Sequence, residues 1–175
     1  DQYIDKTTQR RNTFFGEGLV AHVSFADPVC PSLAYTLFES VEKAGARAHL
    51  GGTYVVMEGP AFSTRAESLL HRSWGADVIG MTALPEARLA REAEICYATL
   101  ACVTDYDAWH ETEAAVSVDV IIDTLKKNTE LSKTAIRHAA GSLPPRDKCG
   151  CGHALAGAIV TDPAMVPAKR REEIS

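Results

Sequence analysis

The sequence Thr53-Tyr54-Val55-Val56-Met57-Glu58-Gly59-Pro60-Ala61-Phe62-Ser63-Thr64-Arg65-Ala66-Glu67 contains the clearest structural pattern in the chain. Its first five residues are mostly β-branched or aromatic, and the run is too short for a helix, so it predicts a buried strand that ends at Glu58. Thr64 and Glu67 match a capping box, in which a hydroxyl and a carboxylate bond the free amides where a helix starts. We therefore expect a strand, a short loop and a helix that ends near Trp74.

Strand and helix patterns continue to alternate on both sides of this stretch. Upstream, residues 31–44 predict a helix, with Pro31 at its start and Gly45 after its end. Downstream, the expected elements are a strand at 76–81, a helix from Pro85 to about Ala93, a strand at 95–103 and a long helix from Ser117 onward. This alternation predicts an α/β fold with a largely parallel sheet. From Gly141 we expect a linker, and poor order in the last residues.

The composition restricts the class of protein. With 175 residues, 46% of them hydrophobic and 23% charged, the chain is expected to form one globular domain. The net charge of -5 and the lack of a long apolar run argue against nucleic-acid binding and a membrane helix. Residues 1–8 do not resemble a signal peptide, and the five cysteines are irregularly spaced, so we expect a cytoplasmic protein.

Polar residues follow each of the three predicted strands. They are residues 58–63, the pair Met81-Thr82, and the run Thr104-Asp105-Tyr106-Asp107. Taken singly, each fits a solvated loop or a helix cap. Because ligands of open α/β sheets bind beyond the carboxyl ends of the strands, their shared position predicts a binding site there.

Asp105 and Asp107 are two residues apart, so both side chains leave one face if the strand geometry continues. Two close carboxylates resist ionising together, which keeps one as a donor and the other as an acceptor. A base edge with an acceptor nitrogen and an exocyclic amino group fits such a pair. A metal site is the weaker interpretation, since no His stands at a completing spacing.

The sequence Cys149-Gly150-Cys151-Gly152-His153 suggests zinc, but no second Cys-rich half follows at ligand spacing, so we do not favour that interpretation. Two others stay open. The pair forms a strained disulfide or bonds Cys96 or Cys102, or the thiols are free and inert. We expect Cys96 and Cys102 to be buried in the predicted third strand.

Taken in order, residues 58–68, residues 74–82, Pro85-Glu86 and residues 104–107 resemble the methylthioadenosine phosphorylases of the trimeric purine nucleoside phosphorylase group. The resemblance begins at Asp1 and loses specificity after about Ala140. It implies a phosphorylase/hydrolase-like three-layer α/β fold with a mixed central sheet, incomplete in this chain, over residues 1–140. Residues 141–175 are then a linker and a Cys-x-Cys tail, and in some thermophilic members that pair is oxidised to a disulfide.

The resemblance also implies a reaction in purine and methionine salvage. Phosphate attacks 5'-methylthioadenosine and releases adenine and 5-methylthioribose 1-phosphate, with phosphate as co-substrate and without a cofactor or metal. Asp105 then protonates or hydrogen-bonds purine N7, and Asp107 accepts from the 6-amino group. The alternatives are an adenosine or methylthioinosine phosphorylase, or an inert nucleoside-binding or structural chain.

The remaining site residues are likewise carried over from the resemblance. Met81 and Phe62 lie beside ribose and base, Ser63 and Thr82 bind phosphate, and His22, Val118 and Ile121 surround the 5' substituent. The family's Gly-rich phosphate loop and Arg-His pair have no match here. We therefore expect an amino-terminal portion as a separate chain, no catalysis without it, and a homo-oligomer, trimer or hexamer, of the assembled unit.

Overall fold

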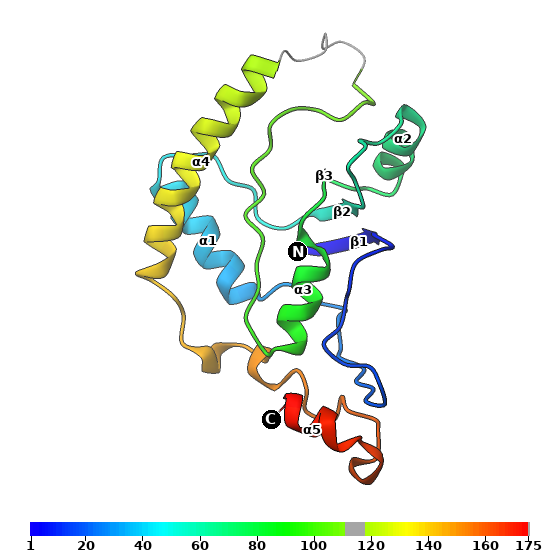
Figure 1. The fold of residues 1–175 in the computed structure, drawn as a ribbon. Helices are drawn as coiled ribbons and strands as arrows, with labels where there is room; N and C mark the ends of the chain where they lie inside the picture. The colour runs from blue at the N-terminus through cyan, green and yellow to red at the C-terminus, as the bar shows by residue number, and fades with distance from the viewer. Residues whose placement is uncertain (111–117, 175) are drawn as a thin grey trace.

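The computed structural model describes residues 1–110 and 118–174 (Figure 1). Three strands form one sheet in the order β1-β2-β3: β1 (Gln2–Lys6), β2 (Thr53–Met57) and β3 (Val78–Gly80). The helices are α1 (Pro31–Lys43), α2 (Arg65–Ser73), α3 (Ala83–Glu92), α4 (Val118–Ala140) and α5 (Ala168–Ile174), with short 3-10 helices η1 (Arg146–Lys148), η2 (Cys151–His153) and η3 (Pro163–Met165). The predicted helices and the first two predicted strands are thus confirmed.

The strands pair in parallel, with Lys6 opposite Met57 and Val56 opposite Gly80. All three therefore end at the same edge of the sheet, and α2 lies beyond that edge (Figure 1). The α/β class with an incomplete sheet is confirmed. Strand β1 is a finding that the sequence did not predict, because its five residues mix polar and apolar side chains.

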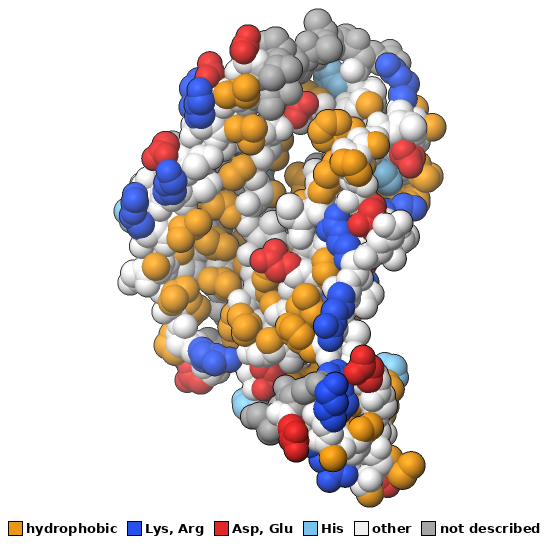
Figure 2. Space-filling model, viewed as in Figure 1, with side chains coloured by type: hydrophobic (Ala, Val, Ile, Leu, Met, Phe, Trp, Pro, Cys, Tyr) orange, Lys and Arg blue, Asp and Glu red, His pale blue; other side chains and the backbone are white. Residues whose placement is uncertain are grey.

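The core joins β2 to α3. Val56, Ala83, Leu84 and Ala87 are buried together and packed against four partly buried aromatic residues: Tyr3, Phe25, Tyr54 and Tyr97. Helix α1 packs against α4. Hydrophobic side chains gather along α4 and between α4 and α3 (Figure 2). No helix in the described part of the chain is long and apolar enough to cross a membrane.

The predicted strand at 95–103 is wrong. These residues form no strand, although Cys30 N donates to Tyr97 O over 2.8 Å. Side chains also bond the segment, such as Tyr3 OH to Thr99 Oγ1 at 2.6 Å. A strand needs a ladder of backbone hydrogen bonds to a second strand, and none of the described strands pairs with this run.

The end of the chain has a path of its own against the body of the protein. Residues 141–174, which we call the tail, return along the loop after β1 and end in α5 (Figure 1). Val160 N donates to Val20 O over 3.0 Å, and the Arg170 guanidinium donates to Phe14 O over 2.8 Å. These long-range bonds give the tail a defined path that its local sequence does not reveal.

Arg10 joins the ends of β2 and β3. Its guanidinium donates to four backbone carbonyls, those of Met57, Glu58, Met81 and Leu84, and to the Glu58 carboxylate over 3.1 Å. The side chain is 23% exposed. One cation thus satisfies carbonyls from two separate loops, which fixes these loops relative to each other.

Replacing Arg10 is expected to destabilise the fold. Arg10→Ala leaves several half-buried carbonyls without a donor and is expected to cost about 3 kcal/mol of unfolding free energy. The matched control is Arg11→Ala, since exposed Arg11 bonds only a neighbouring carbonyl, Thr13 O, and its loss is expected to cost within about 0.5 kcal/mol. Urea unfolding of both variants measures the difference, and equal midpoints would contradict the role given to Arg10.

Candidate active site at the strand ends

The loops after β2 and β3 lie against each other, as the sequence predicts. Gly59 has a φ of +75°, and a Cβ at that position would stand 2.7 Å from Met81 Sδ. A side chain at 59 is therefore excluded both by backbone conformation and by Met81. Arg10 bonds the carbonyls of Glu58 and Met81 in this same place. We call these loops, residues 58–63 and 81–82, the strand-end site.

The polar and aromatic residues of the strand-end site are open to solvent. Thr82 is exposed, and its Oγ1 lies 3.5 Å from the Tyr54 hydroxyl. Met81 is half-buried, and Phe62 is 85% exposed. Phe62 thus presents an exposed aromatic ring at this edge of the sheet.

Ser63 is the exception, because its hydroxyl is buried. Ser63 Oγ has no hydrogen-bond partner among the described residues. It precedes Thr64, the N-cap of α2, whose capping box is complete: Thr64 Oγ1 accepts from Glu67 N over 3.2 Å, and Thr64 N donates to Glu67 Oε2 over 2.7 Å. A buried hydroxyl without a partner is costly, and its place at a helix start suits an anion.

The third predicted strand end is arranged differently. Residues 104–107 do not continue a strand, so the strand geometry that would place Asp105 and Asp107 on one face is absent. Asp105 is exposed and accepts a 2.6 Å bond from Thr104 Oγ1, whereas Asp107 is half-buried.

This aspartate loop is connected to the strand-end site through α2. Trp109 N donates to Ser68 Oγ over 3.2 Å, and the Arg72 guanidinium lies 3.8 Å from the centre of the Trp109 ring. Ser68 itself is buried. The helix that begins after Ser63 therefore also positions the chain just after Asp107.

Three expected residues are not part of this arrangement as described. His22 is exposed, and its backbone N donates to Ala158 O in the tail over 2.8 Å. Val118 and Ile121 belong to the first turns of α4, and their side chains fall outside the described residues. Conversely, Arg10 and Ser68 were missed by sequence reasoning, because neither residue stands in a recognisable pattern.

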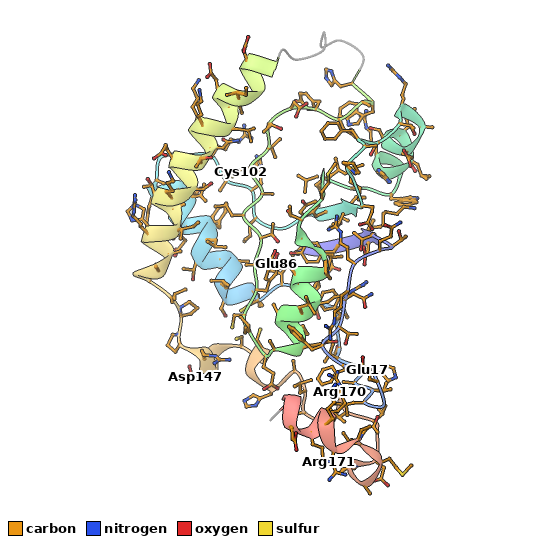
Figure 3. All side chains as sticks on the ribbon, in the orientation of Figure 1. Glu17, Glu86, Cys102, Asp147, Arg170 and Arg171 are labelled. Carbon is orange, nitrogen blue, oxygen red and sulfur yellow. The ribbon has the colours of Figure 1, made fainter. Side chains whose placement is uncertain are left out.

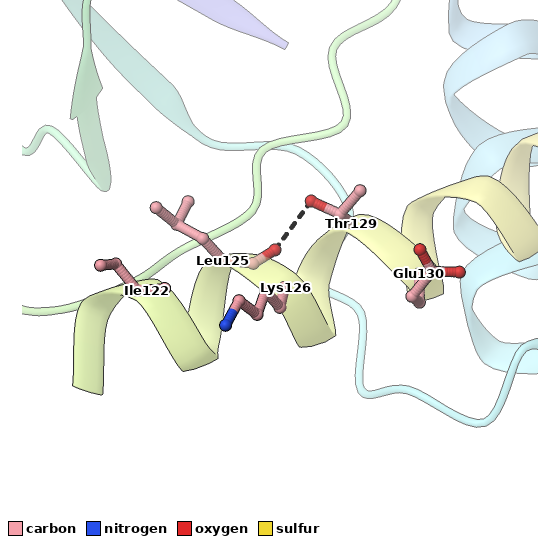
Figure 4. Close-up of a pocket in the computed structure, with 5 residues that line it drawn as sticks. All are labelled: Ile122, Leu125, Lys126, Thr129 and Glu130. Carbon is pink, nitrogen blue, oxygen red and sulfur yellow. Dashed lines mark hydrogen bonds between the residues drawn. The ribbon is translucent and has the colours of Figure 1, made fainter. Parts of the chain in front are cut away.

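A separate shallow pocket of about 290 Å³ lies on α4. Ile122, Leu125, Lys126, Thr129 and Glu130 line it, and Thr129 Oγ1 donates within the helix to Leu125 O over 2.8 Å (Figure 4). Its polar groups are those of one helix face. It therefore offers apolar contact surface, and no converging polar groups that would orient a small ligand.

The cysteines do not form the predicted disulfide. All five are free thiols, and Cys102 is exposed, which also corrects its expected burial. Cys149 and Cys151 lie instead beside Cys30 and Cys96.

Comparison with known proteins agrees with this geometry. The family model described as phosphorylase superfamily matches residues 1–140. The chain belongs to the phosphorylase superfamily. It is 55% identical to the S-methyl-5'-thioadenosine phosphorylase of Geobacter sulfurreducens, over 99% of this chain and 61% of that protein. It is 56% identical to the protein of the same name from Koribacter versatilis, over 99% of this chain and 60% of that protein.

Solved structures show the same relationship. A methylthioadenosine phosphorylase from an antarctic soil metagenomic library has a TM-score of 0.89 and 48% identity, over 98% of this chain and 61% of that one. The Schistosoma mansoni methylthioadenosine phosphorylase in complex with adenine has a TM-score of 0.80 and 30% identity, over 91% of this chain and 64% of that one. The phosphorylase-type fold is thereby confirmed. The chain spans about three fifths of the length of these relatives.

The Glu58 carboxylate gives the site a pH-dependent element. Backbone N–H groups of Thr8 and Gln9 donate to it, Arg10 lies beside it, and the pKa of Glu58 is held below its usual 4.5. A folded-state pKa below the unfolded one stabilises the fold above the unfolded value, and this contribution disappears as the pH falls through the folded pKa.

We predict that Glu58→Gln is less stable than the parent protein at neutral pH. The difference in urea midpoint is expected to shrink as the pH is lowered below 4.5, because the parent carboxylate then becomes protonated. Glu42→Gln, at an exposed carboxylate of α1, serves as control. A difference that stays constant with pH would show that the charge of Glu58 does not matter.

Proposed function

We propose that the protein that contains this chain catalyses phosphorolysis of 5'-methylthioadenosine to adenine and 5-methylthioribose 1-phosphate. The observation that carries the proposal is the buried Ser63 hydroxyl without a partner, at the start of α2 and beside the loops after β2 and β3. Relatives named for this activity are 55 and 56% identical to the chain and support the choice of substrate.

The proposed reaction follows from what each group offers. A phosphate oxygen attacks the anomeric carbon of the ribose. The bond between this carbon and purine N9 breaks, and its electron pair moves into the purine. Asp105 protonates or hydrogen-bonds N7 of the departing base, and Asp107 accepts from the 6-amino group. Phe62 and Met81 contact base and ribose. Adenine presents the acceptor nitrogen and the amino donor that these two roles require.

Phosphate is proposed to bind Ser63, Thr82 and the amino end of α2. The two hydroxyls donate to phosphate oxygens, and the helix amides supply partial positive charge. Arg10 is near these loops, but its Nε and both terminal nitrogens already donate to four backbone carbonyls and to the Glu58 carboxylate. We therefore propose that the balancing cation comes from an amino-terminal portion, present as a separate chain and corresponding to the additional length of the relatives.

Exposed apolar side chains support further assembly. Phe62, Val103, Tyr106, Ile122 and Leu125 are each at least 42% exposed. Such side chains are expected to be covered in the active protein, by the amino-terminal portion or by another copy. We propose a homo-oligomer, a trimer or hexamer, of the assembled unit, with His22, Val118 and Ile121 near the 5' substituent. We propose that it works in the cytoplasm.

The activity is tested with this chain assembled with its amino-terminal portion, in the presence of methylthioadenosine and inorganic phosphate. Chromatography is expected to show equimolar adenine and 5-methylthioribose 1-phosphate, and no adenine when phosphate is omitted. Adenine release at the same rate without phosphate would mean hydrolysis, and no release under either condition would exclude the proposed reaction.

Asp107→Asn tests the recognition of adenine. An amide can donate to a 6-carbonyl, so kcat/KM is expected to fall for methylthioadenosine, and the ratio of kcat/KM for methylthioinosine to that for methylthioadenosine is expected to rise. A loss of about 2 kcal/mol of discrimination corresponds to a roughly 30-fold change in this ratio of kcat/KM values. Asp123→Asn, an exposed surface residue of α4, is the control. An unchanged ratio would remove Asp107 from the base site.

Ser63→Ala tests the phosphate site. Loss of a hydrogen bond to a charged ligand is expected to raise the KM for phosphate about tenfold and to leave the KM for nucleoside nearly unchanged. Ser73→Ala is the matched control, because Ser73 ends the same helix and its hydroxyl bonds only Leu70 O as described. Equal phosphate KM values in both variants would contradict the role of Ser63.

A further inference from the structure

Four cysteines from three distant parts of the chain meet in one place. They are Cys30, Cys96, Cys149 and Cys151, and we call them the cysteine cluster. Their sulfur atoms all lie within 4.8 Å of one another, with Cys96 Sγ 3.4 Å from Cys149 Sγ. Cys30 and Cys151 are buried, and the other two are half-buried. The Cys-x-Cys motif of the sequence provides two of the four thiols, and the fold brings Cys30 and Cys96 to it as the other two.

This spacing fits four ligands around one ion. A tetrahedral Zn²⁺ with Zn–S bonds of about 2.3 Å separates its sulfurs by about 3.8 Å. The sulfurs of the cluster lie within 4.8 Å of one another, and Cys96 Sγ and Cys149 Sγ are 3.4 Å apart, so small side-chain movements bring all four to these separations. Four thiolates without oxygen or nitrogen ligands are the donor set of a closed structural zinc site.

The local backbone fits the role of ligands as well. Cys30 is the N-cap of α1, and its side chain makes no capping hydrogen bond, so the sulfur is available to a metal. The Arg146 guanidinium lies near Gly152 and donates to Glu94 O over 2.8 Å. It thus ties the Cys-x-Cys segment to the end of α3.

We propose that the cysteine cluster binds one Zn²⁺ ion as a structural tetrathiolate site that fixes the tail to the body of the protein. Each thiol gives up its proton to solvent when its sulfur bonds to the ion, and no electron is transferred. The proposal is independent of the proposed phosphorolysis. Two of the ligands, Cys149 and Cys151, stand beyond residues 1–140, to which the family model extends.

The position of the cluster explains what the ion would stabilise. Cys149 and Cys151 belong to the tail, Cys96 follows α3, and Cys30 begins α1. Beyond the cluster the tail bonds the body through hydrogen bonds such as Leu155 N to Glu94 Oε1 at 3.0 Å and Val160 N to Val20 O at 3.0 Å. One ion would add a direct link between the three segments that carry the cysteines.

The metal content of the full-length protein, purified with reductant and without chelator or a histidine tag, tests the proposal. Elemental analysis is expected to find about one zinc per chain. The double variant Cys149→Ser with Cys151→Ser is expected to lose it. Cys102→Ser is the matched control and is expected to retain it, because Cys102 lies beside α4, 3.1 Å from Ser132 Oγ and away from Asp147 and the cluster (Figure 3).

A titration of the parent protein keeps the test valid if the double variant does not fold. After removal of zinc under reducing conditions, addition of Co²⁺ is expected to give the intense visible and charge-transfer bands of tetrahedral cobalt thiolate, with an end point of one ion per chain. Zinc is then expected to abolish these bands.

Three results would overturn the proposal. The first is a metal-free protein whose mass is about 4 Da low, which indicates two disulfides. The second is a metal-free protein with free thiols that gives no cobalt thiolate bands. The third is iron in place of zinc, which would contradict the assigned metal.

Discussion

The structure depends on the guanidinium of Arg10. Parallel strands that end at one edge bring several backbone carbonyls together, and these carbonyls would repel one another without a shared donor. Arg10 bonds four of them and the Glu58 carboxylate. The loops after β2 and β3 are thereby held close enough for Gly59 and Met81 to touch, and α2 and α3 start from fixed positions. The cation that builds the site is for this reason not free to bind phosphate.

Helix α2 extends this order to the rest of the site. It begins directly after the buried Ser63 hydroxyl, and through Ser68 it bonds the backbone at Trp109, just beyond the aspartate loop. The residues proposed to bind phosphate and base are far apart in sequence and are thus connected through one short helix. The cysteine cluster brings together residues that adjoin α1, α3 and the tail, in a different part of the fold. The proposed ligand site and the proposed zinc site are therefore built from separate sets of side chains.

The sequence predicted the elements whose signals are local. The β-branched run at 53–57 and the capping box of Thr64 and Glu67 depend only on residues close together in the sequence. The strand and the helix that they predict are both confirmed. Residues 95–103 look equally apolar, but a strand requires a backbone partner that local composition cannot show. The cysteine cluster was missed for a related reason, since Cys30 and Cys149 meet only through the fold. Arg10 stands in a polar run, where its bonds to distant carbonyls leave no pattern.

A crystal structure of the full-length protein with adenine and phosphate tests the central claim most directly. The account predicts the 6-amino group and N7 of adenine at Asp107 and Asp105, with phosphate within hydrogen-bond distance of Ser63 Oγ and the amino end of α2. Arg10 should remain on its four carbonyls. Adenine bound elsewhere, for example in the pocket on α4, or phosphate held by Arg10 while Ser63 stays unpartnered, would contradict the account.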